Sequence, residues 1–121
     1  MKEIFIEEKL IVYLMMLKIT PNLKGYTYMK ETVKRLCMHE EKKMHMTTGI
    51  YREVAEYFHE KPSLFDRALR HAVEVSYKKN GIEDFERATK FEFPIPKPTA
   101  RDVICMLAEK VAIDLSKTSY I

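Results

Sequence analysis

The side chains best suited to binding chemistry in this chain are Asp66, Arg67 and Arg70. At about 100° per residue, these three share one side of a helix with Ser63. A guanidinium group can donate two parallel hydrogen bonds to guanine, and a carboxylate can accept a hydrogen bond from cytosine. The spacing therefore predicts a helix whose polar side contacts base edges in a DNA major groove.

The opposite side of this helix is apolar and predicts a core-facing surface. Ser63 follows Pro62, and a serine hydroxyl can accept a hydrogen bond from a first-turn amide, so the helix is predicted to begin at Ser63 or Leu64 with Ser63 as its N-cap. Residues 61–79, which start with Lys61, carry five basic and two acidic side chains, a balance that favours contact with phosphates. The predicted core-facing residues are Phe65, Ala68, Leu69, Ala72, Val75 and Ser76.

The segment before this helix has its own helical pattern. Apolar residues recur at helical spacing, and a break follows at residues 60–62. Two helices joined by a short turn form the outline of a helix-turn-helix, but also of a simple hairpin in any all-α protein. The pattern alone leaves both interpretations open. The apolar residues of the first helix are Ile50, Val54, Ala55 and Phe58.

The rest of the chain is also predicted to be helical. A first helix over about residues 3–18 contains a continuous apolar run at residues 10–17, which predicts deep burial or contact with another subunit. A second helix follows Gly25, Asn80 and Gly81 form a helix stop, and a short helix covers residues 82–90. The predicted inward residues are Met29, Val33, Leu36 and Cys37 in the second helix and Ile82 and Phe85 in the short one.

The C-terminal part combines an extended segment with a capped helix. Prolines stiffen residues 91–98, and Thr99 with Asp102 resembles a capping box that opens the last helix. The apolar stripe of that helix is Val103, Leu107, Val111 and Leu115. The predicted fold is all-α, with about six helices that include a helix-turn-helix.

Length and composition favour one domain over residues 1–121. The chain has 121 residues, a net charge of +3 and a pI near 8.8, which permits a nucleic-acid partner without requiring one. The run at residues 10–17 is too short to span a bilayer and lacks the flanks of a signal peptide, so no membrane contact and a cytoplasmic location are expected.

The sequence offers no catalytic or cofactor-binding constellation. Cys37 and Cys105 lack paired metal-ligand spacing and are predicted to be buried free thiols. Residues 44–46, Met-His-Met, contain soft ligands, but one short cluster without a second ligand pair does not predict a metal site. Without a phosphate-binding loop, a nucleophile elbow or a metalloprotease motif, we expect no enzyme, no cofactor and no bound metal.

Four segments resemble one known family, the C-terminal DNA-binding effector domain of the stage-zero sporulation protein A of endospore-forming Firmicutes. Residues 22–26, NLKGY, resemble the family's HIKGY between its first two helices. Residues 66–75, DRALRHAVEV, resemble its recognition helix, ERAIRHAIEV. Residues 97–99, KPT, and 106–110, MLAEK, resemble the turn and the final helix. The resemblance covers about residues 10–115 in the family's order.

The resemblance implies a six-helix, winged-helix-like effector domain without a clear wing. It implies a sequence-specific transcription regulator that binds double-stranded DNA, often as two domains in tandem, and that contacts the RNA polymerase sigma subunit through about residues 80–91. By motif position it makes Asp66 and Arg67 the base-contacting pair and places Ser63 and Arg70 nearer the DNA backbone. The family's N-terminal receiver domain is not expected here, because 121 residues leave no room for it.

The chain departs from the family pattern at several positions of the expected interface. Leu64 replaces an arginine, Glu56 and Tyr57 replace a lysine pair, and Asp66 is shorter than the family's glutamate. A carboxylate near phosphates is repulsive, so these changes predict an altered sequence preference and weaker binding. They also favour an alternative function, a protein-interaction module that pairs with a family member or with RNA polymerase.

Overall fold

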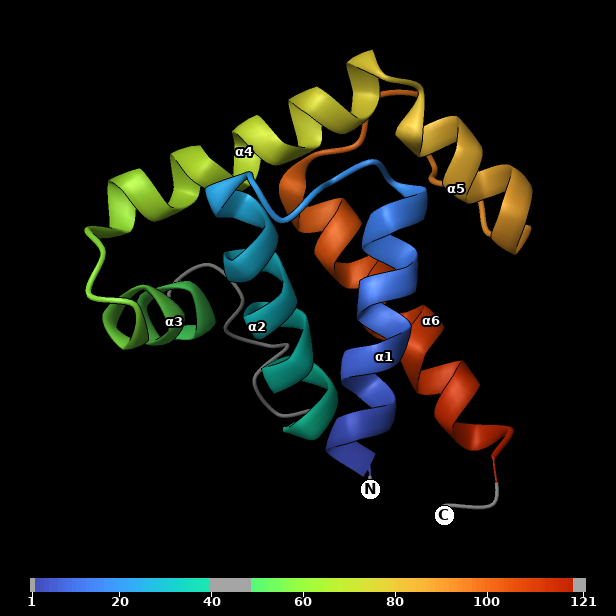
Figure 1. The fold of residues 1–121 in the computed structure, drawn as a ribbon, viewed down its shortest axis with the longest axis horizontal. Coiled ribbons are helices and arrows are strands. Elements are labelled where there is room, and N and C mark those ends of the chain that lie inside the picture. Colours follow the sequence, from blue (N-terminus) through green and yellow to red (C-terminus); the bar gives the residue numbers. More distant parts are fainter. Residues whose placement is uncertain (1, 40–48, 119–121) are drawn as a thin grey trace.

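A computed structural model describes residues 2–39 and 49–118, and those residues form six α-helices and no strand (Figure 1). This confirms the predicted all-α fold. None of the described helices is both long and apolar enough to cross a membrane. The helices are α1 (Lys2–Met16), α2 (Lys24–Met38), α3 (Tyr51–Tyr57), α4 (Pro62–Lys78), α5 (Gly81–Thr89) and α6 (Ala100–Ser116).

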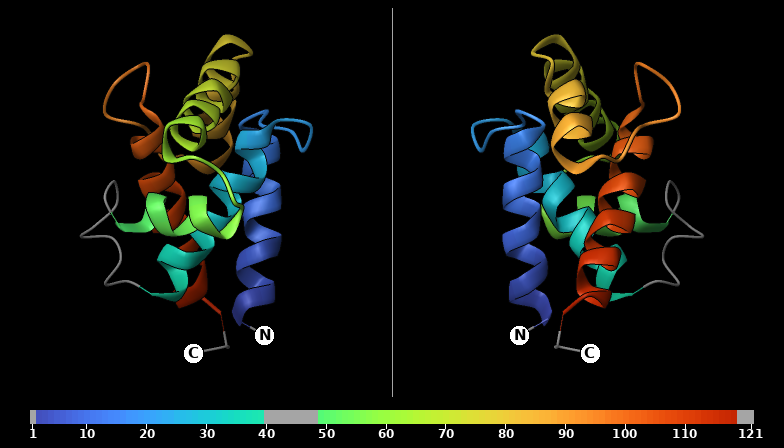
Figure 2. Two further views of the ribbon diagram at one scale, coloured as in Figure 1. Left: turned by 90° about the vertical axis from the view of Figure 1, so that its left-hand side faces the viewer. Right: turned by 90° about the vertical axis from the view of Figure 1, so that its right-hand side faces the viewer.

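Helix α4 lies across one end of a group of three helices. α1, α2 and α6 contact one another, and α2 also contacts α3 and α4. In Figure 1, α4 crosses the top of this group, with α3 below its first turns and α5 after its last turn. The start of α1 and the end of α6 lie at the opposite end of the molecule in each view (Figure 2). The outer side of α4 therefore forms a separate face of the protein.

One continuous core holds these helices together. Phe65 of α4 and Phe85 of α5 are among the largest fully buried side chains, together with leucines of α1 and α2 and Ile104 of α6. Burial of such side chains provides about 1.5–3 kcal/mol each. The predicted inward residues of α2, α5 and α6 are all buried, which confirms their helical pattern.

Helix α1 differs from the prediction of deep burial. Ile6, Leu10, Tyr13 and Leu14 are buried, but only one side of the helix faces the core. Ile4 is 60% exposed and Met15 is 69% exposed, and Ile11 and Val12 are exposed as well. A run of apolar residues has no helical period from which a single buried side can be recognised, so deep burial was wrong for this outer stripe. The alternative, contact of the stripe with another subunit, stays a prediction.

Two glycines permit close approaches between backbones. A Cβ atom on Gly25 would lie 2.5 Å from the carbonyl oxygen of Ala68, so α2 begins directly against α4. A Cβ atom on Gly81 would lie 1.9 Å from the carbonyl oxygen of Leu17. The left-handed conformation at the end of α4 belongs to Asn80, with φ of 62°, and Gly81 already begins α5. Gly81 is therefore required for packing.

Polar contacts fix both ends of α6. The side chain of Thr99 accepts from the backbone of Asp102 and the side chain of Asp102 accepts from the backbone of Thr99, which confirms the predicted capping box. Near its other end, Asp114 accepts hydrogen bonds from the Tyr13 hydroxyl of α1 and from Lys110 Nζ at 2.6 Å. Burial raises the pKa of Tyr13, and its bond to Asp114 adds to the rise.

Candidate nucleic-acid interface

The turn before α4 is closed by the backbone of α3. His59 has a left-handed φ of 56°, and its N–H donates to the carbonyl oxygen of Glu56 at 3.0 Å. The N–H of Glu60 donates to the carbonyl oxygen of Ala55 at 2.8 Å. These two bonds form a Schellman motif, in which glycine is the usual residue at the His59 position. The turn therefore lies at residues 58–61, slightly earlier than the predicted break.

Helix α4 begins earlier than predicted. Lys61 is the N-cap residue, with extended φ and ψ of −68° and 138°, and Pro62 is the first helical residue. Ser63 lies inside the first turn, and no side chain caps this end. The prediction that Ser63 is the N-cap was wrong because proline suits the first helical position and restricts the preceding residue to extended conformations.

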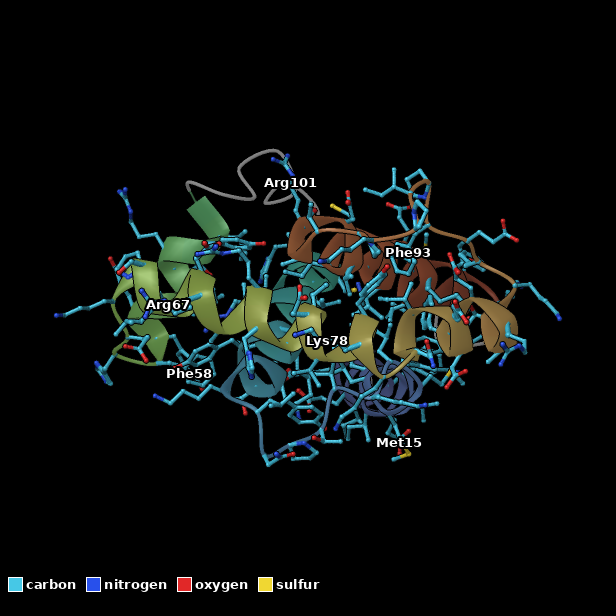
Figure 3. The ribbon with its side chains drawn as sticks, turned by 90° about the horizontal axis from the view of Figure 1, so that it is seen from above. Met15, Phe58, Arg67, Lys78, Phe93 and Arg101 are labelled. Atoms are coloured by element: carbon cyan, nitrogen blue, oxygen red, sulfur yellow. The ribbon has the colours of Figure 1, made fainter. Side chains whose placement is uncertain are left out.

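The two sides of α4 agree closely with the helical pattern. The buried residues confirm most of the predicted core side, although Ala68 and Val75 are only half-buried and Val73 is buried as well. Ser63, Arg67 and Arg70 are exposed, as predicted. Figure 3 looks down on this face, with Arg67 and Lys78 on α4 and Arg101 of α6 to one side. The buried residues of α4 are Phe65, Leu69, Ala72, Val73 and Ser76.

Arg67 and Arg70 differ in their local partners. Arg70 Nε lies 2.9 Å from Asp66 Oδ2, and the side chain of Arg70 is largely exposed whereas that of Asp66 is about half exposed. This pair follows the i, i+4 spacing of a helix and neutralises part of the exposed charge. Within the described part of the chain, Arg67 makes no ion pair. Its donors are therefore available to a partner that approaches α4 from outside.

A first groove runs along the α2 side of α4. It has a volume of about 410 Å³, and its cationic groups come from Lys24 of α2 and Arg67 of α4, beside His71. The acidic residue in its lining is Glu60, which accepts a hydrogen bond from the Tyr28 hydroxyl at 3.0 Å. The remaining lining residues are Asn22, Leu23, Gly25, Leu64 and Ala68.

A second groove runs along the opposite side of α4, toward the start of α6. Its volume is about 320 Å³, and Arg70 and Lys97 provide its cations. Lys97 Nζ lies 5.2 Å from the centre of the Tyr77 ring and 3.4 Å from a carboxylate oxygen of Glu74. The exposed ridge of α4 thus stands between two grooves that each carry positive side chains.

Most positions that depart from the family pattern are exposed, although Asp66 is half-buried. Leu64 is 40% exposed and lines the first groove. Glu56 is exposed on α3, and beside it the ring of Tyr57 lies 4.6 Å from the Arg35 guanidinium. Lys61 is exposed at the start of α4. Sequence reasoning missed Lys24 and Lys97, since their approach to α4 depends on contacts between distant segments.

The described residues contain no group of three or more histidine, cysteine, aspartate or glutamate side chains that could hold a metal ion. The Met-His-Met cluster at 44–46 lies outside the described residues. Cys37 is buried, as predicted, whereas Cys105 is exposed on α6. The burial prediction for Cys105 was wrong because this position lies beside the buried stripe of α6, which contains Ile104 and Leu107.

Comparison with known protein families agrees with this arrangement. The family described as sporulation initiation factor Spo0A C terminal matches residues 10–111, which include the described parts of α2 to α5 and most of α6. Domains of this family are DNA-binding effector domains, and the family is not an enzyme family. The chain therefore belongs to the family of the C-terminal domain of sporulation initiation factor Spo0A.

Proposed function

We propose that this chain is a sequence-specific regulator of transcription that binds double-stranded DNA through the exposed side of α4. The observation that carries the proposal is the exposed Arg67, which makes no ion pair among the described residues and lines the first of the two grooves that flank the exposed side of α4. An α-helix fits the DNA major groove, where arginine forms its commonest specific contact with guanine. Membership of a DNA-binding family supports the same conclusion.

The side chains of α4 are proposed to divide their roles by position. Arg67 and Asp66 contact base edges, whereas Ser63, Arg70 and Lys61 contact the sugar-phosphate backbone and fix the register of the helix. Leu64 replaces a donor with an apolar group that suits the methyl group of thymine, so it changes which bases are preferred.

Titration of fluorescent duplexes selected from a random pool tests the proposal. We expect binding that weakens as salt increases, and loss of Arg67 in an Arg67→Ala variant should cost about 1–3 kcal/mol of binding free energy for the selected duplex. Arg87→Ala is a matched control, because Arg87 is exposed on α5, away from the ridge of α4. Absence of binding to every duplex at low salt would refute the proposal.

Two further parts of the proposal concern partners. Tandem binding of two copies on one DNA element and contact with the RNA polymerase sigma subunit are both properties implied by the resemblance. The sigma contact is assigned to α5 and its flanks, where a groove of about 670 Å³ carries Glu83, Glu86 and Glu92. These carboxylates favour a basic partner surface. In a pull-down experiment, we expect the wild type to retain purified sigma subunit and Glu83→Lys to lose this binding.

A protein-interaction module is the second candidate function. Exposed Leu64 supports it, and so does the outer stripe of α1, which includes Ile4 and Met15. Exposed apolar patches often mark protein interfaces. Light scattering with a full-length family member tests this function, which predicts association that Leu64→Ser or Met15→Ser weakens. Failure to associate both with and without DNA would count against it.

A further inference from the structure

We propose that the two grooves beside α4 receive the two phosphate backbones that border one DNA major groove, with Lys24 as the contact on one side and Lys97 on the other. This inference rests on the proposed function and extends it to residues outside α4. Both lysines come from segments that pack against α4, one from the start of α2 and one from the proline-rich connection before α6.

The placement of the grooves carries the argument. The first groove is lined by Leu64 and Ala68, which lie on the α2 side of the helix, and the second by Val73 and Tyr77, which lie on the opposite side. A helix inserted into the major groove has one phosphate backbone along each of its sides. Cationic side chains on both sides of a single exposed helix therefore match a duplex better than a single anion.

The position of Lys24 is fixed by the backbone beside it. Gly25 allows α2 to approach the carbonyl oxygen of Ala68 so closely that the first turn of α2 stays at the edge of the first groove. The side chain of Lys24 is 78% exposed, and its ion pair with Glu60 is long, at 3.9 Å. Such an exposed pair contributes little free energy, so the ammonium group can exchange the carboxylate for a phosphate.

Lys97 is held in position by its neighbours. It lies between Pro96 and Pro98, and its ammonium group lies over the Tyr77 ring at 5.2 Å. The Lys97 ammonium group donates a hydrogen bond to the Glu74 carboxylate at 3.4 Å, and the same carboxylate lies 3.9 Å from Lys78 Nζ. Because Glu74 stands on the same face, it competes with a DNA phosphate for Lys97.

The test measures how DNA affinity depends on salt in Lys24→Ala, Lys97→Ala and the double variant, with the selected duplex and a random duplex. Each phosphate contact contributes about 0.9 to the slope of log affinity against log salt, so each single variant should lower the slope by about 1 and the double variant by about 2. Each substitution should weaken both duplexes by a similar factor. Lys117→Ala is the charge-matched control, because Lys117 is exposed at the end of α6 remote from α4.

Substitution of Glu74 distinguishes a direct contact of Lys97 with DNA from an indirect effect of a changed structure. Glu74→Gln should tighten binding in the wild-type background and have a smaller effect in the Lys97→Ala background. Slopes of Lys24→Ala and Lys97→Ala equal to that of Lys117→Ala would overturn the inference. If the wild type binds and Arg67→Ala weakens the selected duplex, that result leaves the proposed function standing. If the wild type binds no duplex, the proposed function fails first.

Discussion

In the proposed interface, the Asp66 carboxylate both opposes attraction to phosphates and directs the choice of base. Its ion pair of 2.9 Å with Arg70 lies on the exposed side of α4, so the carboxylate reduces the positive charge that phosphates encounter. The same carboxylate is the group proposed to accept a hydrogen bond from cytosine. Its removal should therefore strengthen general attraction to DNA and weaken discrimination between sequences.

We predict that Asp66→Ala binds a random duplex more tightly than the wild type and distinguishes less well between the selected duplex and a random one. The expected loss of discrimination is about 1–3 kcal/mol. Fluorescence titration of both duplexes at one salt concentration measures it. Weaker binding of the random duplex by the variant would contradict the prediction.

The buried hydroxyl group of Ser76 lowers the stability of the fold. Its hydroxyl oxygen is buried and has no hydrogen-bond partner among the described residues. An unsatisfied buried polar group costs about 1–3 kcal/mol. We predict that Ser76→Ala raises the free energy of unfolding by about 1 kcal/mol, which urea unfolding would show as a higher midpoint with an unchanged slope. Ser116→Ala is the control, because the exposed hydroxyl group of Ser116 donates a hydrogen bond to a backbone carbonyl oxygen at 2.7 Å. The urea midpoint of this variant should not rise.

At the scale of elements, the turn between α3 and α4 determines the direction of α4. His59 occupies the left-handed position of this turn, where a Cβ atom costs about 1–2 kcal/mol. We predict that His59→Gly raises the free energy of unfolding by up to about 1 kcal/mol, because the relief of strain exceeds the added entropy of the unfolded chain. Thermal unfolding measures the change.

The same substitution inside α4 provides the control with opposite sign. His71 is exposed in the middle of the helix, where glycine costs about 0.5–1 kcal/mol relative to alanine. His71→Gly should therefore lower the unfolding temperature while His59→Gly raises it. A decrease for both variants would show that the His59 side chain stabilises the turn.

Local sequence rules predicted most helices but not all of their ends. The spacing of Leu107 and Val111 and the Thr99 capping box identified α6, because these signals depend only on neighbouring residues. The N-cap of α4 was misassigned because both Ser63 and Pro62 carry start signals and only the folded backbone decides between them.

At the scale of the whole molecule, contacts between distant segments account for what the sequence left open. Lys97 approaches Glu74 across 23 positions of the sequence, and no periodicity encodes that pairing. The exposed stripe of α1 could not be predicted from local sequence either, since its apolar residues are of the same types as the buried ones. The ridge of α4 was predictable from spacing, whereas the grooves beside it required the packing of α2 and of residues 97–100.

The packing of Tyr51 predicts a response of the whole fold to high pH. Burial raises the pKa of Tyr51 to about 12, Asp66 and Cys105 add to the rise, and Arg101 opposes it. The pKa of Tyr51 in the folded protein exceeds the ordinary value of 10.0. The stability that the neutral Tyr51 side chain contributes is therefore fully present below about pH 10 and is lost as the pH rises toward 12. A pKa difference of two units corresponds to at most about 2.7 kcal/mol of unfolding free energy, and solvent near the partly exposed ring makes the actual contribution smaller.

We predict that Tyr51→Phe loses less stability than the wild type between pH 10 and pH 12, as measured by urea unfolding at each pH. The phenylalanine ring retains the packing against Phe65, whose ring centre lies 5.8 Å from that of Tyr51. Tyr57→Phe serves as the control at an exposed site. Equal losses in the wild type and Tyr51→Phe would contradict the assignment.

The central claim is that Arg67 contacts a base pair in the DNA major groove, and a double-mutant cycle tests it most directly. The wild type and Arg67→Ala are titrated with the selected duplex and with duplexes that each carry one changed base pair. We predict that Arg67→Ala loses about 1–3 kcal/mol of discrimination at one guanine position and keeps it elsewhere. Discrimination by Arg67→Ala that equals that of the wild type at every position would contradict the claim.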